Sequence, residues 1–405
     1  QSRMLMWYGA NAYTKDQVQD WLPLTDYLDL PFAHNIKAEN QLSTSNAIDY
    51  SNPNIVECLK TQLGQYWKWG VQGAMKDFGE YIPYDTVCYN GLTGAEMHNL
   101  ISVYYGKAAS EAWSSYWGND YILFQRSGFS GSQKYTANFL GDQTVTWRGL
   151  RDQLYATISM GMGGFNIYGG DMGGFNGNTE NETYVRWYQF AAFEPLMRTH
   201  GATELHLPWE KGAVASKNFT QFYWLRENIL DAVYSAAVNA NKTAEPMVQG
   251  MAVAYPYQLR LASVEDEYLF CNNFLVCPIT EKGAFTRSVL LPRGKWYSLW
   301  DYSVVEGGQT VTAEAPTTFI PVYLRSGTVS PITLPASLEL TESMQDVETF
   351  RGLLITPPEA KRTQTVYDST DRNTVYTCEN INESSFSVTA DSASDRRIVL
   401  AYGVT

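Results

Sequence analysis

Up to about residue 260, short apolar runs alternate with longer amphipathic stretches. This alternation is typical of βα units around a parallel sheet. In residues 53–69 the apolar positions share one helical face, Pro53 stands at the first turn and Gly70 follows the end, which predicts a helix. By the same criteria we expect strands at 4–8, 71–75, 121–124, 165–168 and 247–253, and further helices at 95–117, 147–160, 184–197 and 218–238.

Beyond about residue 262 the pattern changes to short apolar runs separated by Gly, Pro, Asp and Ser turns. Strands are expected at 269–278, 288–292, 318–324, 353–356, 374–378 and 397–401. This pattern predicts two small all-β sandwich domains, at 263–332 and 333–405, after an α/β domain at 1–262.

Three segments place acidic residues near glycines, at or close to predicted strand ends. They are Lys76-Asp77-Phe78-Gly79-Glu80, Leu140-Gly141-Asp142-Gln143 and Gly169-Gly170-Asp171-Met172-Gly173-Gly174-Phe175. A lone aspartate in such a position usually caps the next helix. Three of them, together with Arg126 and His200, suit glycosyl transfer, whose oxocarbenium-like transition state needs carboxylates on both faces of the sugar.

Composition excludes some classes of function. The net charge of −13 argues against nucleic-acid binding, which needs a basic surface. No apolar run is long enough for a membrane span. The four His show no metal-ligand spacing, so we expect no metal, and we expect no other cofactor. No Gly-x-Ser-x-Gly follows a strand, so we expect no serine triad. Twelve Trp and 28 Tyr fit stacking on sugars as well as core packing.

Four Asn-x-Ser/Thr sequons are candidate glycosylation sites and favour slightly a secreted, extracellular or lumenal glycoprotein. They begin at Asn181, Asn218, Asn241 and Asn382.

Cys271 and Cys277 are candidates for a disulfide across a bend, although five cysteines leave at least one thiol free. His34, His98 and His206 are expected to be surface or hydrogen-bonded core histidines.

Taken in chain order, the three acidic segments and the segments around Arg126 and His200 resemble glycoside hydrolase family 31. This family includes α-glucosidases, α-xylosidases and sulfoquinovosidases. The arginine segment is Arg126-Ser127-Gly128-Phe129-Ser130-Gly131, and a histidine segment follows at Pro195-Leu196-Met197-Arg198-Thr199-His200-Gly201. Phe270 to Pro278 and Gly294-Lys295-Trp296-Tyr297 are similar to the start of the family's C-terminal sandwich. The resemblance covers about residues 1–332.

The resemblance implies an exo-acting, retaining α-glycosidase, α-glucosidase-like, that acts on an oligosaccharide or glycoside substrate. It implies Asp77 as the nucleophile, Asp142 as the general acid/base, and Arg126 as the residue that holds Asp77 and a sugar hydroxyl. Further sugar-contacting residues implied by it are Phe78, Phe139, Trp147, Asp171, Phe175 and His200. The alternative is a catalytically silent family member with a structural or carbohydrate-binding role.

Three features depart from the resemblance, one of them the turn Phe270-Cys271-Asn272-Asn273, which replaces the usual Gly-Asp-rich turn at a structural position. Lys76 directly precedes the expected nucleophile, where many relatives have a small residue or Thr. Phe175 stands where sulfoquinovosidases have Tyr, and it offers no hydroxyl to a sulfonate. Sulfoquinovose is therefore a minority option among the substrates.

The resemblance also implies that residues 1–262 form the C-terminal part of a (β/α)8 TIM barrel, about strands 3–8, because Asp77 should end the fourth strand. Only one earlier strand, at residues 4–8, precedes it. We therefore expect an N-terminal companion chain that completes the barrel, either a cleaved fragment or a separate subunit, unless the boundary is artificial.

Overall fold

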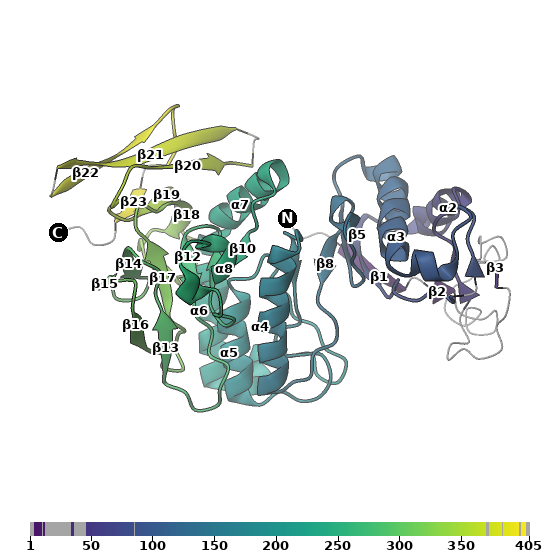
Figure 1. The fold of residues 1–405 in the computed structure, drawn as a ribbon, viewed down its shortest axis with the longest axis horizontal. Helices are drawn as coiled ribbons and strands as arrows, with labels where there is room; N and C mark the ends of the chain where they lie inside the picture. Colours follow the sequence, from purple (N-terminus) through teal and green to yellow (C-terminus); the bar gives the residue numbers. More distant parts are fainter. Residues whose placement is uncertain are drawn as a thin grey trace. The chain divides into compact units, whose positions relative to one another are not determined.

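The computed structural model describes residues 4–9, 11–12, 34–35, 46–84, 86–369, 372–382, 384–396 and 398–401. The chain divides into two compact units, residues 1–139 and 140–405 (Figure 1). In the described ranges, no helix is long and apolar enough to cross a membrane.

The first unit contains a parallel sheet in the order β1-β5-β7-β8. Its strands are β1 (Met4–Gly9), β5 (Val71–Asp77), β7 (Ile122–Gln125) and β8 (Ala137–Phe139). Two helices, α2 (Asn54–Lys68) and α3 (Gly94–Trp117), pack on each other, and α2 also contacts β5. Short pairs complete the unit: β2 (Asn11–Ala12) with β4 (Asn46–Ala47), and β3 (His34–Asn35) with β6 (Thr86–Val87), besides the 3-10 turn η2 (Ser132–Lys134).

The core of this unit follows from the periodic apolar positions of its helices. Ile55, Leu59, Leu63 and Trp67 of α2 are buried, as the predicted apolar face requires. The first turn of α3 is closed by a capping box between Thr93 and Glu96, which satisfies backbone N–H groups that a helix start leaves unpaired. The two helices thereby hold the strands whose ends carry the candidate site.

The second unit begins with an α/β part. Its elements are α4 (Trp147–Met162), β9 (Tyr168–Gly169), α5 (Asn181–Ala191), η3 (Pro208–Lys211), α6 (Ala213–Asn228), α7 (Leu230–Thr243), β10 (Val248–Gly250), α8 (Met251–Ala254) and η4 (Leu259–Leu261). The largest hydrophobic core of the described residues runs from α4 into the strands that follow, so the helices and the all-β part share one interior.

The rest of the chain is all-β, as predicted. A six-stranded antiparallel sheet has the order β10-β11-β12-β17-β14-β15, beside a β13-β16 pair, a β18-β19-β23 sheet and a β20-β21-β22 sheet. The bounds are β11 Tyr268–Phe270, β12 Phe274–Val276, β13 Thr286–Leu290, β14 Lys295–Ser298, β15 Val304–Glu306, β16 Thr310–Glu314, β17 Val322–Arg325, β18 Val329–Pro335, β19 Thr349–Ile355, β20 Arg362–Tyr367, β21 Asn373–Asn382, β22 Ser385–Ala390 and β23 Ile398–Ala401. The predicted domain limits near 262 and 332 remain predictions, and β18 spans the second of them.

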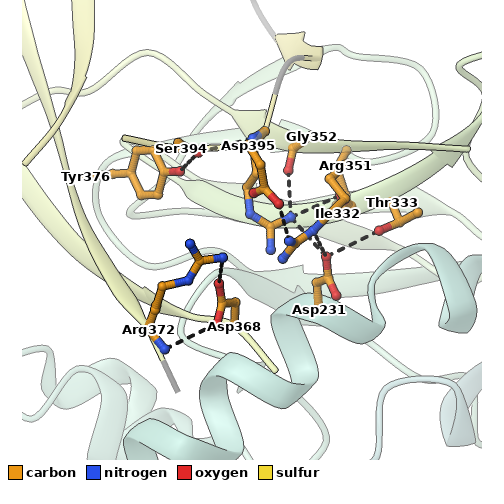
Figure 2. Close-up of polar contacts among 11 residues, drawn as sticks. Asp231, Ile332, Thr333, Arg351, Gly352, Asp368, Arg372, Tyr376, Ser394 and Asp395 are labelled. Atoms are coloured by element: carbon orange, nitrogen blue, oxygen red, sulfur yellow. Dashed lines mark hydrogen bonds and ion pairs between the residues drawn. The ribbon is translucent and has the colours of Figure 1, made fainter. Parts of the chain in front are cut away.

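An ion-pair network ties α7 to the β18-β19 sheet within the second unit. Figure 2 shows Asp231 of α7 facing Arg351 of β19 and Thr333 of β18. Arg396 adds the shortest ion pair to Asp231, at 2.9 Å between Nη1 and Oδ2, and also donates to the carbonyl of Ile332. Because the side chain of Arg396 is only 3% exposed, Asp231 supplies the charge that this buried guanidinium requires.

Two predicted helices and one predicted strand of the α/β part end before their expected limits or are interrupted. The helix predicted at 184–197 ends at Ala191, because Pro195 lacks an N–H and its ring would clash with the carbonyl of residue 191. The helix predicted at 218–238 is broken into α6 and α7 at Ile229, where the side chain of Asn228 bonds to the backbone of Thr333 and Thr341. The strand predicted at 247–253 stops at Gly250, and α8 follows it.

The predicted strand at 269–278 is a hairpin rather than one strand. β11 and β12 pair around a turn in which Cys271 and Asn272 have φ of 48° and 61°. The proposed disulfide between Cys271 and Cys277 is therefore wrong, and both thiols are free. The turn directs Cys271 into one hydrophobic cluster, whereas Cys277 is buried in a different one.

Candidate active site

Asp77 and Arg126 meet where neighbouring strands of the first unit end. Asp77 is the last residue of β5, and Arg126 directly follows β7. Arg126 Nη1 lies 2.9 Å from Asp77 Oδ1, and the two side chains are 16–17% exposed. The backbone N–H of Phe78 donates to the same oxygen at 2.8 Å. Asp77 is therefore a partly solvent-accessible carboxylate held by a cation and an N–H donor.

Glu80 fixes the guanidinium from its other side. Arg126 Nε lies 2.6 Å from Glu80 Oε1, and Nη2 donates to Oε2 at 3.2 Å. This two-point contact holds the planar fork of the guanidinium in one orientation. The guanidinium carbon also stands 4.5 Å from the centre of the Phe78 ring. The sequence motif contains Glu80, but its role was not predicted.

The backbone between Asp77 and Glu80 is in an unusual conformation. Phe78 has φ of 59°, which is uncommon for a bulky residue, and Gly79 follows with φ of 90°. A Cβ on Gly79 would lie 2.6 Å from the ring of Tyr105 and 2.7 Å from Ser127 Oγ, so only glycine fits there. Such conformations gather at functional sites, and this turn brings Glu80 within reach of Arg126.

Lys76, the residue that departs from the family resemblance, points away from Asp77 into the layer beneath α3. Its ammonium is fully buried, donates to Tyr105 O at 2.9 Å and Gln125 Oε1 at 2.7 Å, and lies 3.5 Å from the centre of the Tyr105 ring. Burial lowers the pKa of Lys76 well below its usual value. Gln125 continues the polar layer by donating to the carbonyl of Ser127 at 2.9 Å. Lys76 thus supports the strand ends from the side of α3.

In the second unit, the exposed Asp142 lies on a loop that is tied to the loop after β9. The carbonyl of the next residue, Gln143, accepts from the backbone N–H of Phe175 at 2.8 Å, and Thr144 forms a bridge with Asn176. Thr146 then caps α4 by accepting from Gly149 N. The carboxylate of Asp142 is consequently free to face solvent on a backbone that is held at both ends.

Asp171 is buried and paired. It is 1% exposed and forms an ion pair with Arg198, whose backbone also bridges that of Asp171. Burial raises the pKa of Asp171, and the charges of Arg198 and His200 act in the opposite direction. The role of Arg198 as the ion-pair partner of Asp171 was not predicted from the sequence, although Arg198 lies in the histidine segment.

Phe175 and His200 lie together in the second unit. Their rings are 5.2 Å apart and inclined by 33°. Both side chains are half-buried, which leaves part of each ring accessible. Two of the predicted sugar-contacting residues, from segments 25 positions apart, therefore form one aromatic surface.

The other predicted residues have varied surroundings. Phe139 is buried against Phe124, and Trp147 is half-buried at the start of α4, so their contacts with a sugar remain predictions. His206 is buried within hydrogen-bonding distance of Thr179. His98 is exposed, and the side chain of His34 lies outside the described residues.

The sequons differ in accessibility. Asn218 is 3% exposed, and its amide is used by Gln189 and by the carbonyl of Thr317, so the folded chain does not offer it to a glycan. The other three asparagines are exposed: Asn181, Asn241 and Asn382. Among the side chains that the structure describes, no group of three or more His, Cys, Asp or Glu is placed to hold a metal ion.

Comparison with known families accounts for both parts of the chain. Residues 11–236 match the glycosyl hydrolases family 31 TIM-barrel domain. The chain belongs to glycosyl hydrolase family 31. Residues 244–329 match the C-terminal domain of the same family. The parallel α/β part is therefore a portion of a TIM barrel, as the motifs predict.

Similar proteins carry several activities in their names. The chain is 34% identical to human neutral alpha-glucosidase C over 243 residues, which are 58% of this chain and 27% of that protein. It is 33% identical to a Hordeum vulgare alpha-glucosidase over 254 residues (61% and 28%), and 31% identical to an Escherichia coli K12 sulfoquinovosidase over 295 residues (69% and 43%). The chain thus spans less than half the length of these relatives.

Solved structures show the same fold. A cycloalternan-forming enzyme from Listeria monocytogenes superposes with a TM-score of 0.86 at 24% identity, covering 95% of this chain and 39% of that one. An α-xylosidase from Xanthomonas citri gives 0.81 at 18% identity, with 99% and 48% covered.

Proposed function

We propose that the protein is a retaining, exo-acting α-glycosidase that hydrolyses terminal α-linked sugars, with Asp77 as nucleophile and Asp142 as general acid/base. The observation that carries the proposal is the Asp77–Arg126–Glu80 arrangement at the strand ends. Arg126 holds the carboxyl group of Asp77 through an ion pair, and Glu80 keeps Arg126 in place. A structural ion pair would not need the partial exposure that Asp77 retains.

The reaction proceeds in two balanced steps. A carboxylate oxygen of Asp77 attacks the anomeric carbon while Asp142 gives its proton to the departing glycosidic oxygen, whose bond to that carbon breaks. Water then attacks the anomeric carbon of the glycosyl-enzyme, Asp142 takes the water proton, and the bond to Asp77 breaks. The exposed position of Asp142 leaves its carboxyl group accessible to a departing group and to the attacking water.

Retention makes a geometric demand on the two carboxyl groups. We expect them to lie about 5–5.5 Å apart in the sugar complex. A separation of about 9.5 Å with a water between them would indicate inversion instead.

The sugar itself is the less constrained part of the proposal. An α-glucoside is the first candidate, since several similar proteins are named α-glucosidases. Phe175 has no hydroxyl for a sulfonate, which disfavours sulfoquinovose.

We also propose that the protein is secreted or lumenal, because the sequons at Asn181, Asn241 and Asn382 are exposed. If these sequons carry glycans, treatment of the native protein with a deglycosylating enzyme should lower its mass.

Hydrolysis of a panel of aryl α-glycosides tests the function. Wild type should be active on at least one, Asp77→Ala should lose activity on all, and Asp142→Ala should lose least on the best leaving group, which needs no proton. Asp152→Ala, an exposed aspartate of α4, serves as the matched control and should keep its rate. Sugar binding without turnover would instead indicate the silent, carbohydrate-binding alternative.

A further inference from the structure

A basic cavity lies in the all-β part of the second unit, and none of the candidate active-site residues lines it. Its volume is about 270 Å³. Five cationic side chains line it, against one carboxylate: Arg293, Lys295, Arg325, Lys361 and Arg362, with Glu359. The chain as a whole has a net charge of −13, whereas in this cavity the cations outnumber the carboxylates.

The two cations of this cavity that are partly buried lack a counter-ion among the described residues. Arg325 ends β17 and Arg362 begins β20, and neither forms an ion pair with a carboxylate in the described part of the chain. Burial, followed by the like charge of Arg325, lowers the pKa of Arg362 to about 10. Two guanidiniums that disfavour each other in this way are stabilised by an anion between or beside them.

Two residues that line the cavity carry a donor without a partner among the described residues. Arg362 Nη2 donates to Asn272 O at 3.0 Å and to Asn273 Oδ1 at 3.2 Å, but its buried Nη1 has no partner among the described residues. The buried hydroxyl of Tyr255 likewise has none, and the Tyr255 ring lies 5.5 Å from the Arg325 guanidinium carbon. A buried donor without an acceptor is destabilising, so two of them on residues that line one cavity point to a missing acceptor.

The remaining polar groups are compatible with an anionic ligand. Glu359 directs Oε2 to the backbone N–H of Lys295, at 2.7 Å, so part of its charge is already used. Lys361 is 63% exposed and pairs with Glu379 at 3.0 Å, and Lys295 stands 3.9 Å from Glu306. The lysines are thus the more exposed cations of the cavity, and Arg325 and Arg362 are the more buried ones.

We propose that this cavity binds a small polyvalent oxyanion, namely a phosphate or sulfate group, either free or as a monoester. The guanidinium fork matches the spacing of two oxygens on such a group, and Tyr255 supplies a third donor. The cavity is larger than one such ion, so it also has room for part of an ester. The proposal goes beyond glycoside hydrolysis and does not depend on it.

Calorimetric titration of the whole protein at low ionic strength tests the site. The probes are inorganic phosphate, sulfate and phenyl phosphate, each compared with sodium chloride of equal ionic strength. Saturable binding of at least one oxyanion, and none of chloride, is expected. Binding of phenyl phosphate tighter than inorganic phosphate would assign the site to an ester, and tighter sulfate binding would assign it to a sulfate group.

Three variants connect the binding to the cavity. Tyr255→Phe removes only a hydroxyl that has no partner in the described protein, so it should fold normally and weaken binding about 10-fold. Arg325→Gln should weaken binding at least 10-fold. Lys217→Ala, an exposed cation of α6 that does not line the cavity, is the control and should bind as wild type. Aryl glycoside hydrolysis by Tyr255→Phe should be unchanged.

Two results would overturn the proposal. One is the absence of oxyanion binding stronger than that of chloride. The other is equal affinity in wild type, Tyr255→Phe and Arg325→Gln, which would place the anion elsewhere on the protein.

Discussion

Replacing Glu194 by glutamine should remove a step from the pH dependence of stability. Glu194 is fully buried behind the strand end that carries Asp171. Its carboxyl accepts from Thr157 Oγ1 at 2.7 Å and from Gln153 Nε2 at 3.0 Å, and it is hydrogen bonded to the backbone of Gly170. Burial outweighs these donors and raises the pKa of Glu194 to about 7.

The sign and size follow from that pKa. Between the ordinary value of 4.5 and about 7, the folded protein keeps a proton on Glu194 that the unfolded chain has lost. The free energy of unfolding therefore falls as pH rises through this window, and the loss is complete above pH 7. A shift of this size corresponds to about 3 kcal/mol. Glutamine cannot ionise, so the free energy of unfolding of Glu194→Gln lacks this step. Relative to wild type it should rise by about 3 kcal/mol between pH 4.5 and pH 8, in addition to any difference between the two proteins that does not depend on pH.

Urea unfolding of both proteins at pH 5, 6, 7 and 8, followed by tryptophan fluorescence, measures this difference. Taking the difference between the two proteins cancels the other titrating groups, including Glu267, whose pKa burial also raises to about 7. Glu281→Gln, at an exposed position, is the control and should run parallel to wild type. If Glu194→Gln also runs parallel to wild type, the carboxyl does not titrate in this window and the reasoning is refuted.

Two further variants test contacts elsewhere. Glu80→Gln removes the charge that orients Arg126, so kcat/KM on an aryl α-glycoside should fall about 10-fold, while the free energy of unfolding changes by less than about 1 kcal/mol because the pair is partly exposed; an unchanged kcat/KM would contradict the orienting role. Asp231→Ala leaves the guanidinium of Arg396 buried without its carboxylate, which should cost about 2–3 kcal/mol in urea unfolding. A loss below about 0.5 kcal/mol would mean that Asp231 does not stabilise the contact between α7 and the β sheet.

The sequence predicted those helices whose limits depend on residues within the helix or next to it. The helix α2 has a clear apolar face and Pro53 at its start, and α4 has the cap at Thr146, so both were found within two residues of their bounds. The break at Ile229 was not predictable, because it is accompanied by bonds from Asn228 to Thr333 and Thr341, more than 100 positions away. Tertiary contacts of this kind leave no signal in the periodicity of one helix.

The site was predictable to a similar extent. The rule that parallel strands bring their carboxyl ends together anticipates the contact of Asp77 with Arg126. The second contact, from Glu80, depends on the left-handed conformations of Phe78 and Gly79, and no alternation of polar and apolar residues reveals such a turn. The surroundings of Lys76 also depend on the packing of α3.

Covalent labelling of Asp77 is the most direct test of the central claim. The native protein would be incubated with an activated fluoro-sugar that forms the glycosyl-enzyme quickly and releases it slowly, digested, and mapped by mass spectrometry. We predict one added glycosyl group, on the peptide that contains Asp77, and none in Asp77→Ala. An enzyme that hydrolyses α-glycosides but is labelled at another residue, or never labelled, would contradict the assignment of Asp77 as the nucleophile.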